Sequence, residues 1–533
     1  MSPNPSTVPV TIVGAGPVGL ALAVELGRRG IRCTVVEQRA RLSRIPKGQN
    51  LTQRTMEHFR RWGAEDRLRA ARPTGPDQPA TGLVTYGSLG SGHHYPWMQR
   101  ARVGSFYAAA NERLPQYETE RVLRELVAEL PAVSLRIGWR ARAVRDRGDG
   151  AEVEIVADDG AVETLASDWV VGCDGSHSRI RELAGISQTA SDHERRMALV
   201  VFRSPDLDAI VAGLPPASFI NVLHPDLDGY WQFFGRVDGS GRWFFHAPVD
   251  PGATVETLDV AATLTRAAGR PFDFAVEHVG FWDLRFALAD AYRAGRVFIA
   301  GDAAHSHPPY GGYGINTGFE DAVNLGWKLA AVIGDWAPAS LLDSYDAERR
   351  PVFASLRDEF IARAIETDRL FLNTFDPDAD PDAFAVAWSE RAAAAATEVQ
   401  RYEPQYEGSP IATGSRGASP GALGDHRTEA RPGHHLSPGT DVAGRPVFDL
   451  LAPGFTLLAS AGAEVSSFED AAAARGVPLQ VVRLAADSVE DYGKAAILVR
   501  PDQFVAWAGD PRELSATEVL GTAIGAASRS HPG

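Results

Sequence analysis

Runs of apolar and β-branched residues alternate with helical segments over the first part of the chain. Residues 8–13 form one such run, residues 20–29 carry apolar positions at helical spacing, and residues 32–37 form a second run. This order predicts a strand, a helix and a strand in one βαβ unit. Two later runs, at residues 169–175 and 296–302, predict further buried strands. We therefore expect an α/β fold with a parallel sheet at its centre.

Between residues 190 and 284 the pattern changes to strands alone. The segment 238–241, Asp-Gly-Ser-Gly, separates two short aromatic runs and predicts the turn of a β-hairpin. A four-residue turn pairs Phe234 with Phe245 on one face of the hairpin. It pairs Phe233 with His246 on the opposite face. We predict a β-sheet domain inserted into the α/β domain.

One face of this hairpin is expected to cover an aromatic substrate, and the other to pack on helices. The alternation of side chains leaves open which face does which. The residues chosen as substrate candidates, mainly from the face of Phe234, are Tyr230, Gln232, Phe234, Arg236, Trp243 and Phe245, with Pro308 from a later loop.

The end of the chain divides into two parts. Residues 376–440 combine an Ala-rich helix with a Gly-, Ser- and Pro-rich stretch, which predicts a connector. Residues 441–533 alternate strands and helix and predict a small α/β domain. The expected division is 1–75, 105–190 and 285–375 for a cofactor-binding domain, 76–104 and 191–284 for a substrate-binding domain, 376–440 for the connector, and 441–533 for the C-terminal domain.

Composition narrows the function classes. The 533 residues are 44% hydrophobic and 23% charged, enough for two to four domains. The net charge is −15 and no stretch concentrates Lys and Arg, which argues against a nucleic-acid partner. Two cysteines, Cys33 and Cys173, are too few for a disulfide framework, and no apolar run reaches the roughly 20 residues that span a bilayer. We expect a cytoplasmic protein without a membrane span that acts on a small molecule.

The first strand and helix are joined by a glycine motif. Gly14, Gly16 and Gly19 have the G-x-G-x-x-G spacing. The first glycine permits a tight turn, the second admits a pyrophosphate, and the third lets helix and strand pack closely. Glu37 lies at the end of the second strand, where its carboxylate can accept the ribose hydroxyls of a dinucleotide. The motif therefore predicts a Rossmann-like site that suits FAD or NAD.

A second glycine-rich segment follows the strand predicted at 296–302. Gly301 and Asp302 end that strand, and a loop rich in proline and glycine leads into a helix over 315–330. A carboxylate at this edge of the sheet suits ribityl hydroxyls, and side-chain-free backbone suits a flat ring. The first N–H groups of the helix would stabilise negative charge on a reduced flavin. We therefore predict that FAD is the bound dinucleotide.

Three segments carry a family resemblance: GAGPVG from residue 14, CDGSHSR from residue 173, and GDAAHSHPPYGGYGIN from residue 301. Together they resemble the fingerprints of the single-component FAD-dependent aromatic hydroxylases. The segments QNLTQRTMEHFRRWG and LPQYETERVLRE resemble the phenol and 2,4-dichlorophenol hydroxylase branch, with its relatives in polyketide tailoring. The resemblance implies a p-hydroxybenzoate hydroxylase-like fold with a thioredoxin-like C-terminal domain.

The resemblance also implies an activity. In this family NADPH or NADH reduces FAD, and O2 then forms a C4a-hydroperoxyflavin that hydroxylates a phenolic or hydroxypyridine-type ring. Both antibiotic biosynthesis and aromatic catabolism use such enzymes, and the family suggests a homodimer. Since the C-terminal domain has no cysteine, its role is expected to be structural or at a subunit interface.

Carried over to this chain, the resemblance assigns cofactor contacts around both glycine segments. The expected FAD-binding residues are Gly14, Ala15, Gly16, Pro17, Gly19, Glu37, Gln38, Arg39, Arg54, Gln116, Asp174, Gly301, Asp302, Pro309, Gly312, Gly314, Ile315 and Asn316. Asp321, farther along the helix, is interpreted as structural.

No catalytic side chain is assigned. Some phenol hydroxylases have an acid just before the Q-x-R-T-like segment, whereas this chain has Lys47, Gln49 and Asn50 nearby. No metal is expected either, because His305 and His307 lie in the flavin loop without acids or cysteines at ligand spacing. The alternative function is an FAD-dependent reductase or oxidase of a small apolar substrate.

Overall fold

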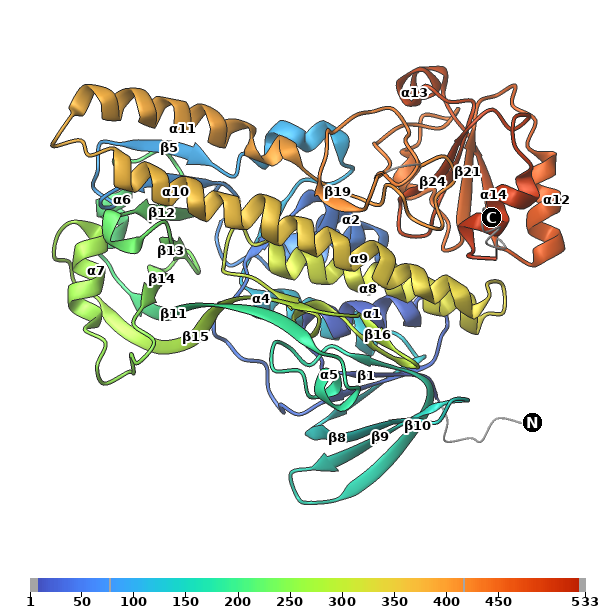
Figure 1. Cartoon of the computed structure of the whole chain (residues 1–533), viewed down its shortest axis with the longest axis horizontal. Coiled ribbons are helices and arrows are strands. Elements are labelled where there is room, and N and C mark those ends of the chain that lie inside the picture. Colours follow the sequence, from blue (N-terminus) through green and yellow to red (C-terminus); the bar gives the residue numbers. More distant parts are fainter. Residues whose placement is uncertain (1–7, 76–77, 416–417, 527–533) are drawn as a thin grey trace.

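The computed structural model describes residues 8–75, 78–415 and 418–526, and the side chains of 192–194 are outside that description. Figure 1 shows two large sheets linked by long helices, with the C-terminal domain packed at one end. Each sheet matches one of the patterns in the sequence.

The first sheet carries the βαβ unit. Its path runs β16-β17-β10-β1-β2-β7, and β1 pairs in parallel with both β2 and β10. The bounds are β1 Val8–Val13, β2 Cys33–Glu37, β7 Val133–Ile137, β10 Val162–Gly172, β16 Arg293–Ala294 and β17 Val297–Ile299. Two further strands, β8 Trp139–Asp146 and β9 Ala151–Ala157, extend it in antiparallel fashion from β10.

Helices pack on this sheet because its central strands are apolar on both faces. The helix α1 Pro17–Gly27 packs against α8 Tyr313–Ile333 and α4 Gln116–Ala128. Within the described chain, α8 is buried from Asn316 to Ala331 without a break. The two segments that carry the glycine motifs, almost 300 residues apart, therefore begin adjacent helices.

The second sheet has the order β18-β15-β11-β14-β13-β12-β4-β5. The bounds are β4 Gly82–Tyr86, β5 His94–Trp97, β11 Gln188–Arg203, β12 Phe219–Leu223, β13 Gln232–Arg236, β14 Arg242–Val249, β15 Ala275–Ala289 and β18 His305–Ser306. The hairpin of β13 and β14 has the predicted register, with Phe234 opposite Phe245 and Phe233 opposite His246. The strands β11 and β15 extend a few residues beyond the expected range of 191–284.

Helices from three regions surround the second sheet. The short α6 Leu207–Val211 and α7 Val260–Ala268 cover one face, and α11 Pro381–Arg401 contacts the edge strand β5. A helix over residues 343–374 crosses the molecule in Figure 1, as α9 Asp343–Ser355, a π-helical segment Leu356–Ile361 and α10 Ala362–Thr374. The segment predicted as a connector thus contributes a long helix that packs on the second sheet.

The C-terminal domain has a four-stranded sheet of order β22-β21-β23-β24. The strands are β21 Phe455–Ala459, β22 Leu479–Arg483, β23 Ala496–Val499 and β24 Val505–Gly509, with helices α12 Ser466–Arg475, α13 Ala486–Tyr492 and α14 Ala516–Ala523. The first pair is parallel and the other two are antiparallel, which is the thioredoxin-like arrangement.

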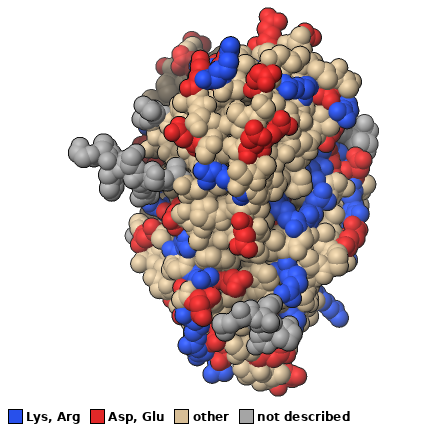
Figure 2. Space-filling model, turned by 90° about the vertical axis from the view of Figure 1, so that its right-hand side faces the viewer, with Lys and Arg blue, Asp and Glu red and all other residues tan. Residues whose placement is uncertain are grey.

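Acidic and basic side chains are interspersed over the face drawn in Figure 2. Among the described helices, none combines the length and apolar character needed to cross a membrane.

Candidate active site

The turn after β1 is shaped by two crowded glycines and one open glycine. Gly14 has a φ of +107°, and a Cβ there would lie 2.3 Å from the carbonyl oxygen of Cys173. A Cβ on Gly19 would lie 2.0 Å from the carbonyl oxygen of Gly14. At Gly16, by contrast, no described atom beyond its two chain neighbours comes within 4 Å of the corresponding position. The backbone is therefore packed on the protein side and accessible on the other side.

The N-terminus of α1 faces that accessible side. Gly16 is its N-cap and makes no side-chain cap within the described structure, and Pro17 occupies the first turn. Unpaired N–H groups at a helix N-terminus bind anions, so the position suits a pyrophosphate.

Glu37 lies beside the same turn. Its carboxylate accepts hydrogen bonds from the backbone N–H groups of Ala15, at 2.8 Å, and Arg39, at 2.7 Å. The side chains of Gln38 and Arg39 are exposed. The arrangement holds an acid at the end of β2, as the glycine motif requires for a ribose contact.

The end of β17 reaches the same edge of the sheet. Gly301 has a φ of +60°, and its N–H donates to Oδ2 of Asp321 at 2.9 Å. Asp302 is exposed to solvent, yet the surrounding protein desolvates its carboxylate and raises its pKa. An exposed but crowded carboxylate at a strand end is suited to accept hydroxyl groups.

Asp321, in α8, holds the end of β17 through its hydrogen bond with the N–H of Gly301. Its carboxylate also contacts Nε2 of His305 at 2.7 Å and Nε of Arg349 at 2.8 Å, and all three side chains are buried. Among the described residues, no group of three or more His, Cys, Asp or Glu side chains is arranged to hold a metal. The structural interpretation of Asp321 agrees with these contacts.

The N-terminus of α8 is held by the side chain of Asn316. Its Oδ1 accepts from the N–H of Thr52 at 2.8 Å and the hydroxyl of Thr55 at 2.6 Å, while Nδ2 donates to the carbonyls of Asn50 and Gly312. The Asn316 amide is thereby occupied within the protein. A cofactor contact at this position would use backbone rather than side chain.

Other expected cofactor residues gather beside this helix. A Cβ built on Gly48 would lie 3.5 Å from Cγ2 of Ile315 and 3.7 Å from Oε1 of Gln116. Gly312, with a φ of +77°, caps α8, and no side chain in the described structure caps its first turn. Pro309 lies in the loop before α8 and Gly314 in the first turn of α8, and both are partly exposed.

Arg54 is engaged by contacts within the protein. In α2 Gln53–Arg61 its guanidinium forms ion pairs with Glu57 and Glu320, each at 3.1 Å, and hydrogen bonds to Asp502 and Gln503. It lines a small pocket shared with Asn316 and residues of the C-terminal region. The guanidinium of Arg54 therefore connects α2 with the C-terminal domain.

Asp174 is adjacent to the turn but is used locally. Its carboxylate accepts hydrogen bonds from the hydroxyl of Ser178 and from the N–H of Ile180, at the start of α5 Arg179–Leu183. Its backbone N lies 3.0 Å from the Cβ position of Gly14. The side chain therefore shapes the wall of the turn.

The substrate candidates require a correction of face. Phe234, Trp243 and Phe245 are at most 1% exposed and pack against Leu264 and Ala267 of α7. They form the outer core of the sheet, because the apolar side of α7 covers that face.

The other candidates lie in different surroundings. Arg236 pairs with Asp208 of α6 and stacks over Trp243, on the same outer face. Gln232 is buried, and Tyr230 lies in the main core. Pro308 is buried in the loop of residues 307–312 that leads into α8, here called the glycine loop.

The opposite face of the hairpin is directed toward the glycine loop. Phe233, Phe244 and Trp282 lie on it, with Ile45 from the segment that precedes Gly48. Farther along, Trp231 lies 4.6 Å from Tyr310 between ring centroids. This face, which the sequence allowed as an alternative, is the one not covered by α7, and Trp231 connects it to the loop before α8.

Two buried polar side chains lie on this inner face. His246 stacks on Phe233 at 4.7 Å, and burial lowers its pKa to about 3. Nδ1 of His246 and Oδ1 of Asn221 have no hydrogen-bond partner among the described residues. The pairing of His246 with Phe233 was the one sequence signal for this role, and Asn221 gave none. Both are suited to bind polar groups of a substrate.

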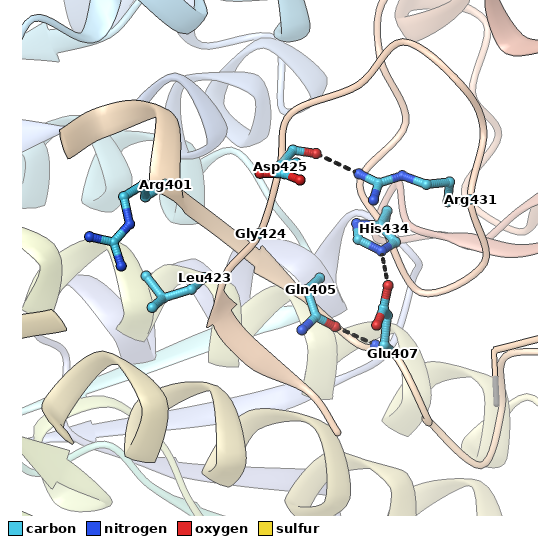
Figure 3. A pocket seen from close by; sticks show the side chains of 8 residues that line it. All are labelled: Arg401, Gln405, Glu407, Leu423, Gly424, Asp425, Arg431 and His434. Carbon is cyan, nitrogen blue, oxygen red and sulfur yellow. Dashed lines mark hydrogen bonds and ion pairs between the residues drawn. The ribbon is translucent and has the colours of Figure 1, made fainter. Parts of the chain in front are cut away.

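A separate pocket lies in the connector. Figure 3 shows it beside the paired strands β19 Tyr402–Gln405 and β20 Gly421–Leu423. Its lining residues are Arg401, Gln405, Glu407, Leu423, Gly424, Asp425, Arg431 and His434. None of the expected cofactor or substrate residues lines this pocket.

Comparison with known proteins adds the family context. Residues 7–359 match the family model described as "FAD binding domain", and residues 430–527 match "Aromatic-ring hydroxylase, C-terminal". The chain is similar to the FAD-dependent monooxygenase apdD of Emericella nidulans, with 32% identity over 95% of this chain and 88% of the relative. It is also similar to 4-methyl-5-nitrocatechol 5-monooxygenase of a Burkholderia species, with 33% identity over 97% of this chain and 98% of the relative.

Solved structures show the same likeness. The rebeccamycin biosynthetic enzyme RebC with reduced flavin has a TM-score of 0.84 and 30% identity, over 98% of this chain and 100% of that chain. The flavin-dependent monooxygenase PieE in complex with FAD and substrate has a TM-score of 0.85 and 26% identity, over the same shares.

Proposed function

Because this chain belongs to the family of FAD-binding aromatic-ring hydroxylases, we propose that it inserts one oxygen atom of O2 into an aromatic ring. NADPH or NADH supplies the two electrons that balance the reaction. The second oxygen atom leaves as water, and the ring C–H bond becomes C–OH. The site geometry supports this activity over that of a simple reductase or oxidase.

The residues present fit FAD. The open position at Gly16 and the uncapped N-terminus of α1 suit its pyrophosphate, Glu37 suits the adenosine ribose, and Asp302 suits the ribityl chain. Bound FAD would accept hydride from NAD(P)H and activate O2 for transfer to the ring.

The protein groups contribute position and electrostatics. The first N–H groups of α8 would stabilise negative charge on the flavin ring, because they form the positive end of the helix dipole. Phe233, Phe244 and Trp282 hold an aromatic ring and exclude water from it. His246 is neutral at ordinary pH, so its unprotonated nitrogen can accept a hydrogen bond from a substrate hydroxyl.

The observation that carries the proposal is the aromatic inner face, which meets the same glycine loop that ends the flavin cradle. A pure reductase needs the cradle but no enclosed aromatic surface above it.

The test is oxygen labelling of turnover by the purified holoenzyme. The protein is supplied with NADPH, ¹⁸O2 and a panel of phenols, hydroxypyridines and polyketide aromatics. We expect one compound to accelerate NADPH oxidation and to gain one ¹⁸O atom. NADPH oxidation that yields only hydrogen peroxide with every aromatic would instead establish the oxidase or reductase alternative.

We further propose a cytoplasmic location and a homodimer. Cys33 and Cys173 are both free and buried, which fits a reducing compartment. Light scattering of the holoenzyme would determine the oligomeric state.

A further inference from the structure

Arg113 is a buried arginine beside the inner face of the substrate sheet. It lies in β6 Glu112–Arg113, which pairs with β3 Asn50–Leu51, and it is 3% exposed. Its Nη2 donates to the carbonyl of Arg236 at 2.8 Å, and its guanidinium carbon lies 5.9 Å from the ring centroid of Phe219.

No carboxylate in the described structure forms an ion pair with Arg113. The adjacent Glu112 is bound instead to Arg69 and Arg72, each at 3.0 Å. Burial, with the neighbouring Arg72 and Arg236, lowers the pKa of Arg113 to about 9. A buried charge without a counter-ion is destabilising, so this arginine is held at a cost that a ligand can offset.

The buried arginines of the described chain fall into two groups. Arg349 pairs with Asp321, and Arg500 pairs with both Glu348 and Asp502. Arg100, Arg113 and Arg181 form no ion pair in the described structure and donate to backbone carbonyls. Among these three, Arg113 is the one beside the inner face of the sheet, where Asn221 and His246 carry buried polar atoms without a partner.

Gly235 shows where the guanidinium lies. A Cβ at Gly235 would be 3.0 Å from Nη2 of Arg113 and 2.2 Å from the ring of Phe244. Phe244 belongs to the inner face, so Arg113 contacts that same face. The glycine leaves the space that the arginine and the phenylalanine share.

Asn221 and His246 lie one step along the sheet from this position. Gly235 pairs with Phe219 and Phe244, and Phe233, two residues earlier, pairs with Asn221 and His246. Two residues of a strand span about 7 Å, roughly the length of one aromatic ring with its substituents. The inner face therefore presents one cationic group and two neutral polar groups at intervals that suit a planar substrate.

We propose that Arg113 binds an anionic oxygen of the aromatic substrate, a carboxylate or an ionised phenol, and selects such substrates over neutral ones. Asn221 and His246 bind neutral polar groups farther along the ring system. The proposal rests on the proposed function, since it places the anion in the substrate site of a hydroxylase. It assigns the substrate class as planar aromatic acids.

The first test compares matched ligands with the oxidised holoenzyme at pH 8. One pair is 6-hydroxy-2-naphthoate and its methyl ester, and the other is 4-nitrophenol, which is ionised, and 4-nitroanisole. Binding is followed by the change in flavin absorbance and by calorimetry. A charge-assisted hydrogen bond predicts about tenfold or greater preference for the anion in at least one pair. The pair that shows it distinguishes carboxylate from phenolate.

The second test assigns that preference to Arg113. Arg113→Met should abolish the preference and leave the affinity for the neutral partner nearly unchanged, while Arg113→Lys should retain part of it. Arg203→Met is the control, because Arg203 is a half-exposed arginine of the same sheet that pairs with Glu277. Equal binding of anion and neutral partner in both wild-type pairs, or a preference that survives Arg113→Met, overturns the proposal. The wild-type comparison holds even if a variant does not fold.

Failure of this inference is distinguishable from failure of the proposed function. Anion preference that depends on Arg113, without ¹⁸O incorporation, would retain the anion site and reject hydroxylation. Hydroxylation of a neutral ring without anion preference would retain the enzyme activity and reject the anion site.

Discussion

Replacement of Arg500 by methionine should weaken the attachment of the C-terminal domain. Arg500 follows β23, and its guanidinium contacts both carboxylate oxygens of Glu348 in α9, at 2.6 and 2.9 Å. It also binds Asp502, and Lys328 binds Glu348 at 2.7 Å. All four side chains are at most 1% exposed. The cluster is neutral overall, with two cations and two anions.

The magnitude follows from the charge that the substitution leaves behind. Arg500→Met leaves Glu348 and Asp502 with Lys328 alone, so one buried negative charge is uncompensated. Removing one partner of a buried pair costs about 3–5 kcal/mol. The double variant Arg500→Met, Asp502→Asn removes one charge of each sign. Its loss should therefore be about 1–3 kcal/mol smaller than the sum of the two single variants.

Urea unfolding measured by tryptophan fluorescence provides the assay. Trp327 donates to Asp502 at 2.9 Å and reports on this contact, and limited proteolysis shows whether the C-terminal domain detaches first. The free energy of the first transition is compared among the wild type, both single variants and the double variant. A loss below about 1 kcal/mol for Arg500→Met, or strict additivity in the double variant, would refute the reasoning.

Three further predictions concern the candidate site. Gly14→Ala should give protein with little bound FAD, because its Cβ would overlap a backbone carbonyl, whereas Gly16→Ala should weaken FAD binding with little change in apoprotein stability. Flavin absorbance per chain measures bound FAD, and thermal unfolding measures stability. An equal loss of stability in the two variants would contradict the assigned roles. Phe234→Ala should destabilise the protein by about 3–5 kcal/mol as a core truncation, whereas Phe233→Ala should mainly raise KM for the aromatic substrate; the reverse result would show that the faces are assigned wrongly. The pKa of His246 is about 3 in the folded protein against an ordinary value of 6.5, so the unfolded chain takes up the proton first and stability falls as the pH decreases through this window. Between pH 7 and 5 the wild type should lose about 2 kcal/mol more than His246→Leu in urea unfolding. Parallel pH profiles of the two proteins would be incompatible with a buried neutral imidazole.

The sequence by itself determined the parts of the protein that depend on local geometry. The roles of Gly14, Gly16 and Gly19 could be assigned from spacing, because a positive φ or a missing Cβ is a property of one residue and its neighbours. The register of β13 and β14 followed from the turn length and the two-residue alternation of a strand. These constraints act within a few residues, so they can be seen without the fold.

Tertiary structure alone decided which face of the hairpin is covered by α7 and which is left for the proposed cofactor and substrate. Phe234 and Phe233 are equally apolar and adjacent in the chain, and only the packing of α7 on one side assigns the first to the core. Arg54 has Glu57 three residues later in the same helix, but its second acid, Glu320, and the lack of an acid beside Arg113 both depend on segments distant in the chain. Burial and charge compensation arise from contacts across the whole fold, and for that reason the substrate side of the site emerged from the structure.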